Sequence, residues 1–308
     1  MSRRNFVALC SAAGLSLAAL TSGCVHPDAS AAPQRSEETV QAAAPKTGYA
    51  PVNGLQMYYE IHGTGQPLVL LHGALTTVDT SFGKLLPGLA KTRQVIAVEQ
   101  QAHGHTADID RPLSYEQMAD DTAALLRHLG VQSADIFGYS MGGGVALQLA
   151  IRHPDLVRKL VVAAASYNSD GMYPEMLAGI EHLTPEALAG SPFEQDYLRT
   201  APNPAHWSRL VNKVKELDMK PQAWPPETIQ AIRAPTLTII GDSDIIRPEH
   251  AVAMFRLRGG GVPGDLTGLP SAQLAVLPGT THVSLIDRAD LLLPIIPAFL
   301  DAPLPKAP

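Results

Sequence analysis

The stretch that decides the fold reads ADIFGYSMGGGV and covers residues 134–145. Its first part, Ala134 to Phe137, is a short apolar run typical of a buried strand, and the residues from Met141 onward have the pattern of a helix. Ser140 therefore stands at a sharp strand-to-helix turn, where its hydroxyl is exposed and the flanking glycines remove Cβ atoms that would clash. A serine in this position is a candidate nucleophile, and the alternative is a glycine-rich start of a helix.

Short β runs alternate with helical segments on both sides of this turn. Such alternation predicts the α/β fold class, with a mostly parallel, twisted sheet covered by helices on both faces. The expected strands cover residues 57–61, 68–71, 95–98, 134–137, 160–163, 236–240 and 273–277; the expected helices cover 115–129, 141–153, 248–257 and 288–300; and residues 259–271 are expected to form a flexible loop. Ser114 and Gln117 form a capping box in front of the helix that Gly130 closes.

Residues 166–232 interrupt this alternation. They are helical and punctuated by proline, with expected helices at 175–182, 186–189 and 206–217 and no convincing strand. We interpret them as an inserted helical lid. Its apolar side chains are candidates for lining a substrate pocket over Ser140, although at helical spacing each one alone is more typical of a core. The set comprises Met172, Tyr173, Met176, Leu177, Tyr197, Trp207 and Trp224, and we take Met172, Tyr173 and Trp207 as the substrate-binding candidates.

A serine nucleophile needs a histidine to take its proton and a carboxylate to orient that histidine. Asp244 and His282 each follow an expected strand, and the resulting order along the chain is Ser, Asp, His. Because the carboxyl ends of parallel strands meet at one edge of a sheet, we expect both residues to approach Ser140 there. Asp242 is the main alternative to Asp244 as the acid of the triad. Asp170, which follows the preceding expected strand, is a less favoured alternative.

Acyl transfer also needs donors for the oxyanion of the tetrahedral intermediate. The backbone amide of Met141 directly follows the candidate nucleophile, and the backbone amide of Ala74 follows His72-Gly73 in the loop after an upstream strand. These two amides are the predicted oxyanion hole. The alternative for His72-Gly73 is a simple turn.

His72-Gly73, the glycine-flanked Ser140, Asp244 and His282 together resemble the α/β-hydrolase fold superfamily, in its lid-bearing branch of serine esterases, lactonases and perhydrolase-like enzymes. The resemblance runs from about residue 49 to residue 301. It implies a serine hydrolase that cleaves a carboxylic ester or lactone of a small, moderately hydrophobic molecule through an acyl-enzyme. Serine instead of aspartate at position 140 argues against epoxide hydrolase and haloalkane dehalogenase activity, which use a carboxylate nucleophile.

Two other functions stay open. Cofactor-free perhydrolase or haloperoxidase-like chemistry, and C–C bond hydrolysis, would use the same three residues. A small-molecule binding protein that keeps the fold but not the turnover belongs to another class. The motifs are specific for the fold and the triad, and they do not specify the substrate.

The chain departs from the pattern of this superfamily at residues 99–106, EQQAHGHT, where relatives commonly have an aspartate, a glycine-histidine-glycine and a serine. The loop borders the pocket in this fold, so the change affects either substrate fit or only loop packing. His103 and His105 also suggest a metal site, but no third ligand stands at a suitable spacing. We expect no metal and no cofactor.

Residues 1–23 resemble a bacterial export signal. The apolar run FVALCSAAGLSLAAL at residues 6–20 is short for a membrane-spanning helix and suits a signal peptide. The pair Arg3-Arg4 ahead of it resembles a twin-arginine signal. We therefore expect export to the periplasmic side of a bacterial membrane.

The segment LTSGC at residues 20–24 resembles a bacterial lipobox. Cys24 is then the expected lipidation site and the only link to a membrane, while an ordinary signal cleaved nearby would release a soluble periplasmic or secreted protein. Residues 24–46 have the composition of a flexible tether, which places the hydrolase domain at 47–308. Cys10 lies in the removed segment, so the mature chain forms no internal disulfide.

Composition limits the partners. Of 308 residues, 45% are hydrophobic, which is enough for a sizeable core, and 23 Lys and Arg against 29 Asp and Glu give a net charge of −6. No basic face appears, so we expect no nucleic acid partner. The expected partner is a small-molecule ester or lactone substrate, and the oligomeric state is left open.

Overall fold

The computed structural model describes residues 44–304. The expected signal peptide, the lipidation site Cys24 and nearly all of the tether lie outside these residues. The first strand, β1 (Lys46–Val52), begins at the last residue of the range expected for the tether. Between residues 44 and 304, no helix combines the length and the apolar character needed to cross a bilayer.

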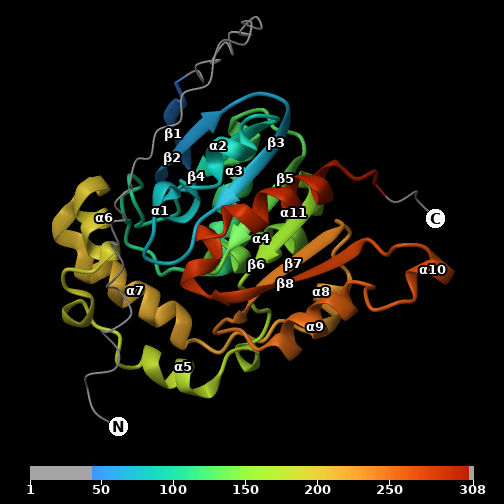
Figure 1. Cartoon of the computed structure of the whole chain (residues 1–308). Coiled ribbons are helices and arrows are strands. Elements are labelled where there is room, and N and C mark those ends of the chain that lie inside the picture. Colours follow the sequence, from blue (N-terminus) through green and yellow to red (C-terminus); the bar gives the residue numbers. More distant parts are fainter. Residues whose placement is uncertain (1–43, 305–308) are drawn as a thin grey trace, which may run out of the picture. The chain divides into compact units, whose positions relative to one another are not determined.

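Eight strands form one sheet in the order β1-β2-β4-β3-β5-β6-β7-β8 (Figure 1). The pairs β1/β2 and β2/β4 are antiparallel, and every other neighbouring pair is parallel. The predicted α/β class with a mostly parallel sheet is thus confirmed. The remaining strands are β2 (Leu55–His62), β3 (Gln66–Leu71), β4 (Arg93–Val98), β5 (Ala134–Tyr139), β6 (Val157–Ala163), β7 (Thr236–Ser243) and β8 (Ala272–Thr281).

Side chains of the central strands alternate between two apolar cores, one on each face of the sheet. Val69 and Leu71 of β3 belong to the core that includes helices α3 and α4, whereas Leu68 and Leu70 belong to the core that includes α1, α2 and α11. Burial on both faces is what makes these strands continuous apolar runs in the sequence. The helices are α1 (Val78–Phe82), α2 (Leu86–Leu89), α3 (Tyr115–His128), α4 (Met141–Arg152) and α11 (Ala289–Asp301).

The segment expected as a lid is helical. It contains α5 (Pro174–Ile180), α6 (Pro192–Thr200), α7 (Trp207–Met219) and α8 (Pro226–Gln230), with the short 3-10 helices Glu186–Leu188 and Pro204–His206 in the connections between them. Helix α6 is attached to α1 through the carboxylate of Asp196, which accepts hydrogen bonds from the hydroxyls of Thr77, at 2.7 Å, and Thr80. Figure 1 shows α5, α6 and α7 outside the layers that cover the sheet.

The chain after β7 continues with α9 (Pro248–Leu257) and α10 (Gly264–Thr267) before it enters β8. The expected flexible loop at 259–271 therefore holds a short helix. Gly268, which has φ +81°, ends that helix.

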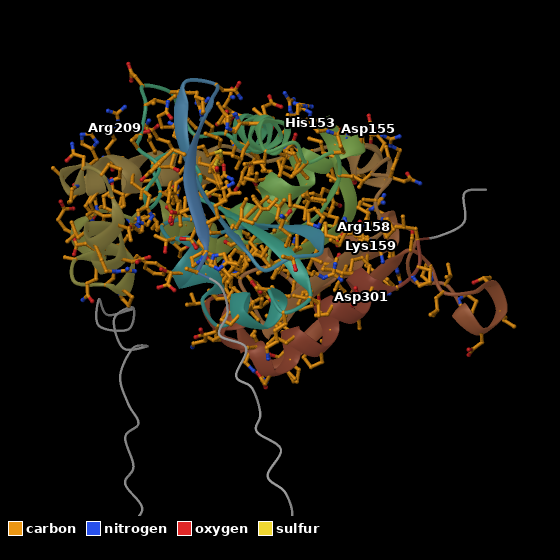
Figure 2. All side chains as sticks on the ribbon, turned by 90° about the horizontal axis from the view of Figure 1, so that it is seen from above. His153, Asp155, Arg158, Lys159, Arg209 and Asp301 are labelled. Atoms are coloured by element: carbon orange, nitrogen blue, oxygen red, sulfur yellow. The ribbon has the colours of Figure 1, made fainter. Side chains whose placement is uncertain are left out.

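A cluster of buried charges attaches the C-terminal helix to the sheet. Arg93 and Asp135 are both buried and lie 3.0 Å apart, and Arg93 also pairs with Asp301 at the end of α11. Lys159 is 1% exposed and donates from Nζ to the carbonyl oxygen of Leu300 at 3.1 Å. A cation at the C-terminal end of a helix is favourable because the carbonyl groups there are unpaired. Figure 2 shows Lys159 and Asp301 in this cluster.

Candidate active site

Ser140 stands where β5 passes into α4. Its φ is +53° and its ψ is −120°, a conformation that non-glycine residues rarely adopt. The Ser140 amide donates to the carbonyl oxygen of Ala163 at 2.9 Å, and its carbonyl accepts from the amide of Gly143 at 2.8 Å. A Cβ at Gly142 would lie 2.0 Å from the carbonyl oxygen of Leu71. The glycines of the motif therefore allow the helix to approach the sheet closely at this turn.

The structure brings the predicted histidine and acid to this serine. Ser140 Oγ lies 2.9 Å from His282 Nε2, and His282 Nδ1 lies 2.8 Å from Asp244 Oδ1. Asp244 directly follows β7, His282 directly follows β8, and the parallel strands end at one edge of the sheet. The Tyr139 hydroxyl donates to the carbonyl oxygen of His282 at 3.0 Å and so ties the histidine loop to the serine turn. Our sequence analysis did not identify this tyrosine.

The hydrogen bonds define what each group can do. A carboxylate only accepts, so Nδ1 of His282 carries a proton toward Asp244, and Nε2 is free to accept a proton from Ser140. The Asp244 side chain has no exposed surface, whereas the His282 side chain is 15% exposed. Asp244 is held further by the backbone amides of Gly241, at 3.3 Å, and Ile246, at 3.2 Å. This arrangement can activate a serine hydroxyl.

The two competing aspartates have other partners. Asp242 accepts hydrogen bonds from the amides of Gly279, at 2.9 Å, and Thr280, at 3.1 Å. These bonds lower the pKa of Asp242 and link the ends of β7 and β8. Asp170 is exposed, and its carbonyl oxygen accepts from the Arg247 guanidinium. Of the three aspartates, Asp244 is the one hydrogen-bonded to His282.

The predicted oxyanion loop lies beside the serine. A Cβ at Gly73 would be 3.5 Å from the Ser140 Cβ, and the Thr76 hydroxyl shapes the loop by donating to the Gly73 carbonyl at 2.8 Å. Neither the Ala74 amide nor the Met141 amide donates a hydrogen bond to another residue of the described range. Both amides are therefore available to a ligand, and their role in an oxyanion hole stays a prediction.

The EQQAHGHT loop is held by buried hydrogen bonds. His72 donates from Nδ1 to the Gly73 carbonyl at 2.8 Å and accepts from the Gln100 amide at Nε2, at 3.0 Å. Burial lowers the pKa of His72, which agrees with this neutral tautomer. The Glu99 carboxylate accepts from His105 Nδ1 at 2.9 Å. These hydrogen bonds fix the conformation of the loop. Within residues 44–304, no group of His, Cys, Asp and Glu side chains is arranged to hold a metal ion.

The three substrate-binding candidates lie in different surroundings. Trp207 is 5% exposed and packs against Tyr197 with ring centroids 5.4 Å apart, so it is part of an apolar core. Met172 forms an isolated β-bridge with Ile246, which lies two residues after Asp244. The side chain of Tyr173 is 40% exposed. Contact with a substrate stays a prediction for Met172, Tyr173 and Trp207.

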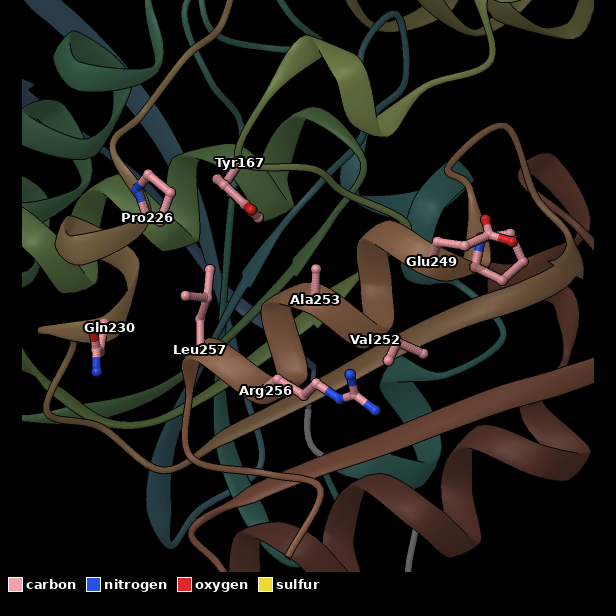
Figure 3. A pocket seen from close by; sticks show the side chains of 9 residues that line it. Tyr167, Pro226, Gln230, Glu249, Val252, Ala253, Arg256 and Leu257 are labelled. Carbon is pink, nitrogen blue, oxygen red and sulfur yellow. The ribbon is translucent and has the colours of Figure 1, made fainter.

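A hollow of about 800 Å³ lies between α8 and α9 (Figure 3). Tyr167 lines it and stacks on His250, with ring centroids 4.5 Å apart. Ser140 and His282 are not among its lining residues, so it is a separate feature. It is lined by Tyr167, Pro226, Gln230, Pro248, Glu249, Val252, Ala253, Arg256 and Leu257.

Similarity to known proteins agrees with this architecture. The family model described as alpha/beta hydrolase fold matches residues 66–218. The chain is 30% identical over 267 residues to a 2-hydroxymuconate semialdehyde hydrolase of Pseudomonas putida, in an alignment that covers 77% of this chain and 88% of that protein. It is 34% identical over 116 residues to a protein of the same name from another Pseudomonas, which covers 37% of this chain and 41% of that protein. This second match thus spans less than half of the relative.

Among solved structures, the enol-lactonase from Burkholderia xenovorans has a TM-score of 0.62 and is 20% identical, over 82% of this chain and 100% of that chain. At this identity the likeness shows the fold alone. The names of the sequence relatives support hydrolase chemistry in general terms. Because one relative that is 30% identical aligns over 88% of its own length and the family model matches residues 66–218, the chain belongs to the α/β hydrolase fold family.

Proposed function

We propose that this protein is a serine hydrolase that cleaves a carboxylic ester or lactone of a small, moderately hydrophobic molecule. The observation that carries the proposal is the chain of hydrogen bonds from Ser140 to His282, at 2.9 Å, and from His282 to Asp244, at 2.8 Å. A serine beside a histidine that a buried carboxylate orients is the arrangement that activates a hydroxyl for acyl transfer.

The proposed reaction has two halves. Ser140 Oγ attacks the carbonyl carbon while His282 Nε2 takes its proton, and the amides of Ala74 and Met141 stabilise the oxyanion. His282 then gives the proton to the departing alkoxide, which leaves an acyl-enzyme. In the second half, His282 deprotonates a water molecule that attacks the acyl group. The carboxylic acid product then departs as Ser140 recovers its proton from His282.

C–C bond hydrolysis is the second candidate. It is favoured by one observation, that two relatives are named 2-hydroxymuconate semialdehyde hydrolase. The same three residues would serve both reactions, so the geometry of the triad does not separate them. Only the fit of the substrate under the lid distinguishes an ester from a ring-cleavage product.

A substrate panel tests the choice. The whole chain is assayed with 4-nitrophenyl esters of graded acyl length, with lactones, with 2-hydroxymuconate semialdehyde, and for peroxide-dependent halogenation. We expect kcat/KM for the best ester or lactone to exceed about 10⁴ M⁻¹s⁻¹, within the usual range of enzymes. A higher value for the semialdehyde would establish the second candidate, and halogenation without ester turnover would favour the perhydrolase alternative. Tight binding without turnover would indicate a binding protein.

We also propose that the protein is exported and lipidated at Cys24. The support is the lipobox-like segment at residues 20–24 behind an apolar run. Acyl chains on Cys24 insert into a bilayer at about 0.8 kcal/mol per buried CH₂, so the wild-type chain should sediment with membranes after expression in a Gram-negative host. Cys24→Ser should move it to the soluble fraction. Equal sedimentation of both proteins would contradict lipidation as the anchor.

A further inference from the structure

One buried side chain contacts several parts of the candidate active site. Tyr139 is the last residue of β5 and directly precedes Ser140. Its side chain is 4% exposed and belongs to the apolar core that includes α1, α2 and α11. Neither the triad nor the predicted oxyanion donors assign it a role, yet its ring and its hydroxyl each contact a loop that carries one of these groups.

The hydroxyl of Tyr139 reaches the loop that carries His282. It donates to the backbone carbonyl oxygen of His282 at 3.0 Å. In the sheet, β6 and β7 lie between β5 and β8, so this hydrogen bond joins the serine turn to a loop at the end of the edge strand. Burial raises the pKa of the Tyr139 hydroxyl, and the charges of Asp244 and Asp287 raise it further. The hydroxyl therefore keeps its proton at neutral pH and stays a donor.

The ring of Tyr139 packs against the remaining parts of the site. A Cβ at Gly73, in the predicted oxyanion loop, would be 2.9 Å from Cε1 of Tyr139 and 3.5 Å from Cβ of Ser140. The ring also lies beside the imidazole of His282, with centroids 5.5 Å apart and an interplanar angle of 33°. Because close packing fixes the ring, the hydroxyl at its end has a defined position relative to Ser140.

Other contacts hold the histidine loop at different points. The carboxylate of Asp242 holds the end of β8, ahead of the histidine, and Asp244 holds the imidazole at Nδ1. Neither contact reaches the backbone of His282. The hydrogen bond from Tyr139 is made at the carbonyl of His282 itself, so it fixes the point from which the imidazole extends toward the nucleophile.

We propose that the Tyr139 hydroxyl is a positioning group that sets the reach of His282 Nε2 to Ser140 Oγ. Catalysis depends steeply on such distances, and a displacement of about 1 Å can reduce a rate about 100-fold. Without the hydroxyl, the histidine loop keeps its bonds to β7 but loses its fixed position relative to β5. The distance from Ser140 Oγ to His282 Nε2, which is 2.9 Å in the structure, then varies. The inference rests on the proposed function, because it assigns Tyr139 to the proton transfer of that reaction.

Tyr139→Phe tests this proposal, because it removes the hydroxyl and keeps the ring that packs against Gly73. We expect kcat for the best ester to fall about tenfold, the loss of one hydrogen bond, while KM stays within about twofold because the substrate contacts are kept. Tyr59→Phe is the matched control and should keep the wild-type kcat. Tyr59 is 8% exposed and lies on β2, with β4 and β3 between it and β5. A wild-type kcat in Tyr139→Phe, or a rise in KM alone, would overturn the inference.

Nitrogen NMR of the histidine-labelled protein separates positioning from a general loss of stability. At a pH where the imidazole is neutral, the Nε2 resonance of His282 reports the hydrogen bond from Ser140, and Ser140→Ala gives its value without that bond. The resonance of Tyr139→Phe should move from the wild-type value toward that of Ser140→Ala, and Tyr59→Phe should match the wild type. A lower melting temperature in Tyr139→Phe, with an unchanged resonance and an unchanged kcat, would show a merely structural role.

The proposed function fails in a different way. If the wild type hydrolyses no ester or lactone, that function is contradicted, and the inference is decided by measurements that need no ester. The Nε2 resonance should still shift in Tyr139→Phe, and labelling of Ser140 by a fluorophosphonate probe should slow about tenfold. If the probe does not label the wild type, the resonance alone decides. An unchanged resonance in Tyr139→Phe would refute the role of Tyr139 whatever the reaction.

Discussion

Ser140→Ala should lower kcat for the best ester by about 10⁴-fold or more, because the variant has no nucleophile and retains only the oxyanion donors and substrate binding. The structure supports an effect of this size since Ser140 Oγ is the group hydrogen-bonded to His282, at 2.9 Å. The measurement is steady-state release of 4-nitrophenol by both proteins. A fluorophosphonate probe, which reacts with activated serines, should label the wild type and not the variant.

The control for this experiment is another serine. Ser208 is exposed on α7, so Ser208→Ala should keep both turnover and labelling. Melting temperatures of all three proteins show whether the fold is kept. If Ser140→Ala melts normally and hydrolyses the ester at the wild-type rate, the proposed mechanism is wrong.

Asp244→Asn should reduce kcat by about 10⁴-fold, as the loss of the acid does in a serine protease triad. An amide can present N–H to the imidazole, which favours the tautomer with its proton on Nε2, and that nitrogen then no longer accepts the proton of Ser140. The charge that stabilises the imidazolium is also lost. Turnover of the best ester and fluorophosphonate labelling rates measure the effect.

Asp242→Asn is the matched control, since it makes the same chemical change two residues away. The Asp242 carboxylate accepts from the amides of Gly279 and Thr280, and an asparagine oxygen can still accept one of these bonds. Its kcat should therefore fall by no more than about tenfold. A larger loss of kcat in Asp242→Asn than in Asp244→Asn would show that Asp242, and not Asp244, is the acid of the triad.

Local sequence was sufficient for the features that depend on local sterics. Gly138 and Gly142 mark a turn that only residues without a Cβ allow, because a side chain at either position would meet backbone atoms at 2.1 Å or less. The alternation of apolar runs and helices predicted the parallel sheet, since strands buried on both faces must be apolar throughout. The order of Ser140, Asp244 and His282 followed from their positions after these strands.

Some elements escaped the sequence analysis because their signals are not local. Strand β1 contains Gly48 and Pro51 and buries only Ala50 and Val52, so pairing with β2 accounts for it better than its own pattern does. Helix α6 is short, and it is held by hydrogen bonds that the hydroxyls of Thr77 and Thr80 donate to the carboxylate of Asp196.

The sequence by itself determined the class of fold, the serine turn and the candidates for its partners, because these depend on glycine sterics and on apolar periodicity. Only the tertiary structure chose between Asp242 and Asp244, since two carboxylates two residues apart in the sequence have the same local signal. Hydrogen-bond distances decide that choice, with Asp244 2.8 Å from His282. The Tyr139 hydroxyl and the carbonyl oxygen of His282, 3.0 Å apart, likewise belong to segments far apart in the chain, which meet only when the protein folds.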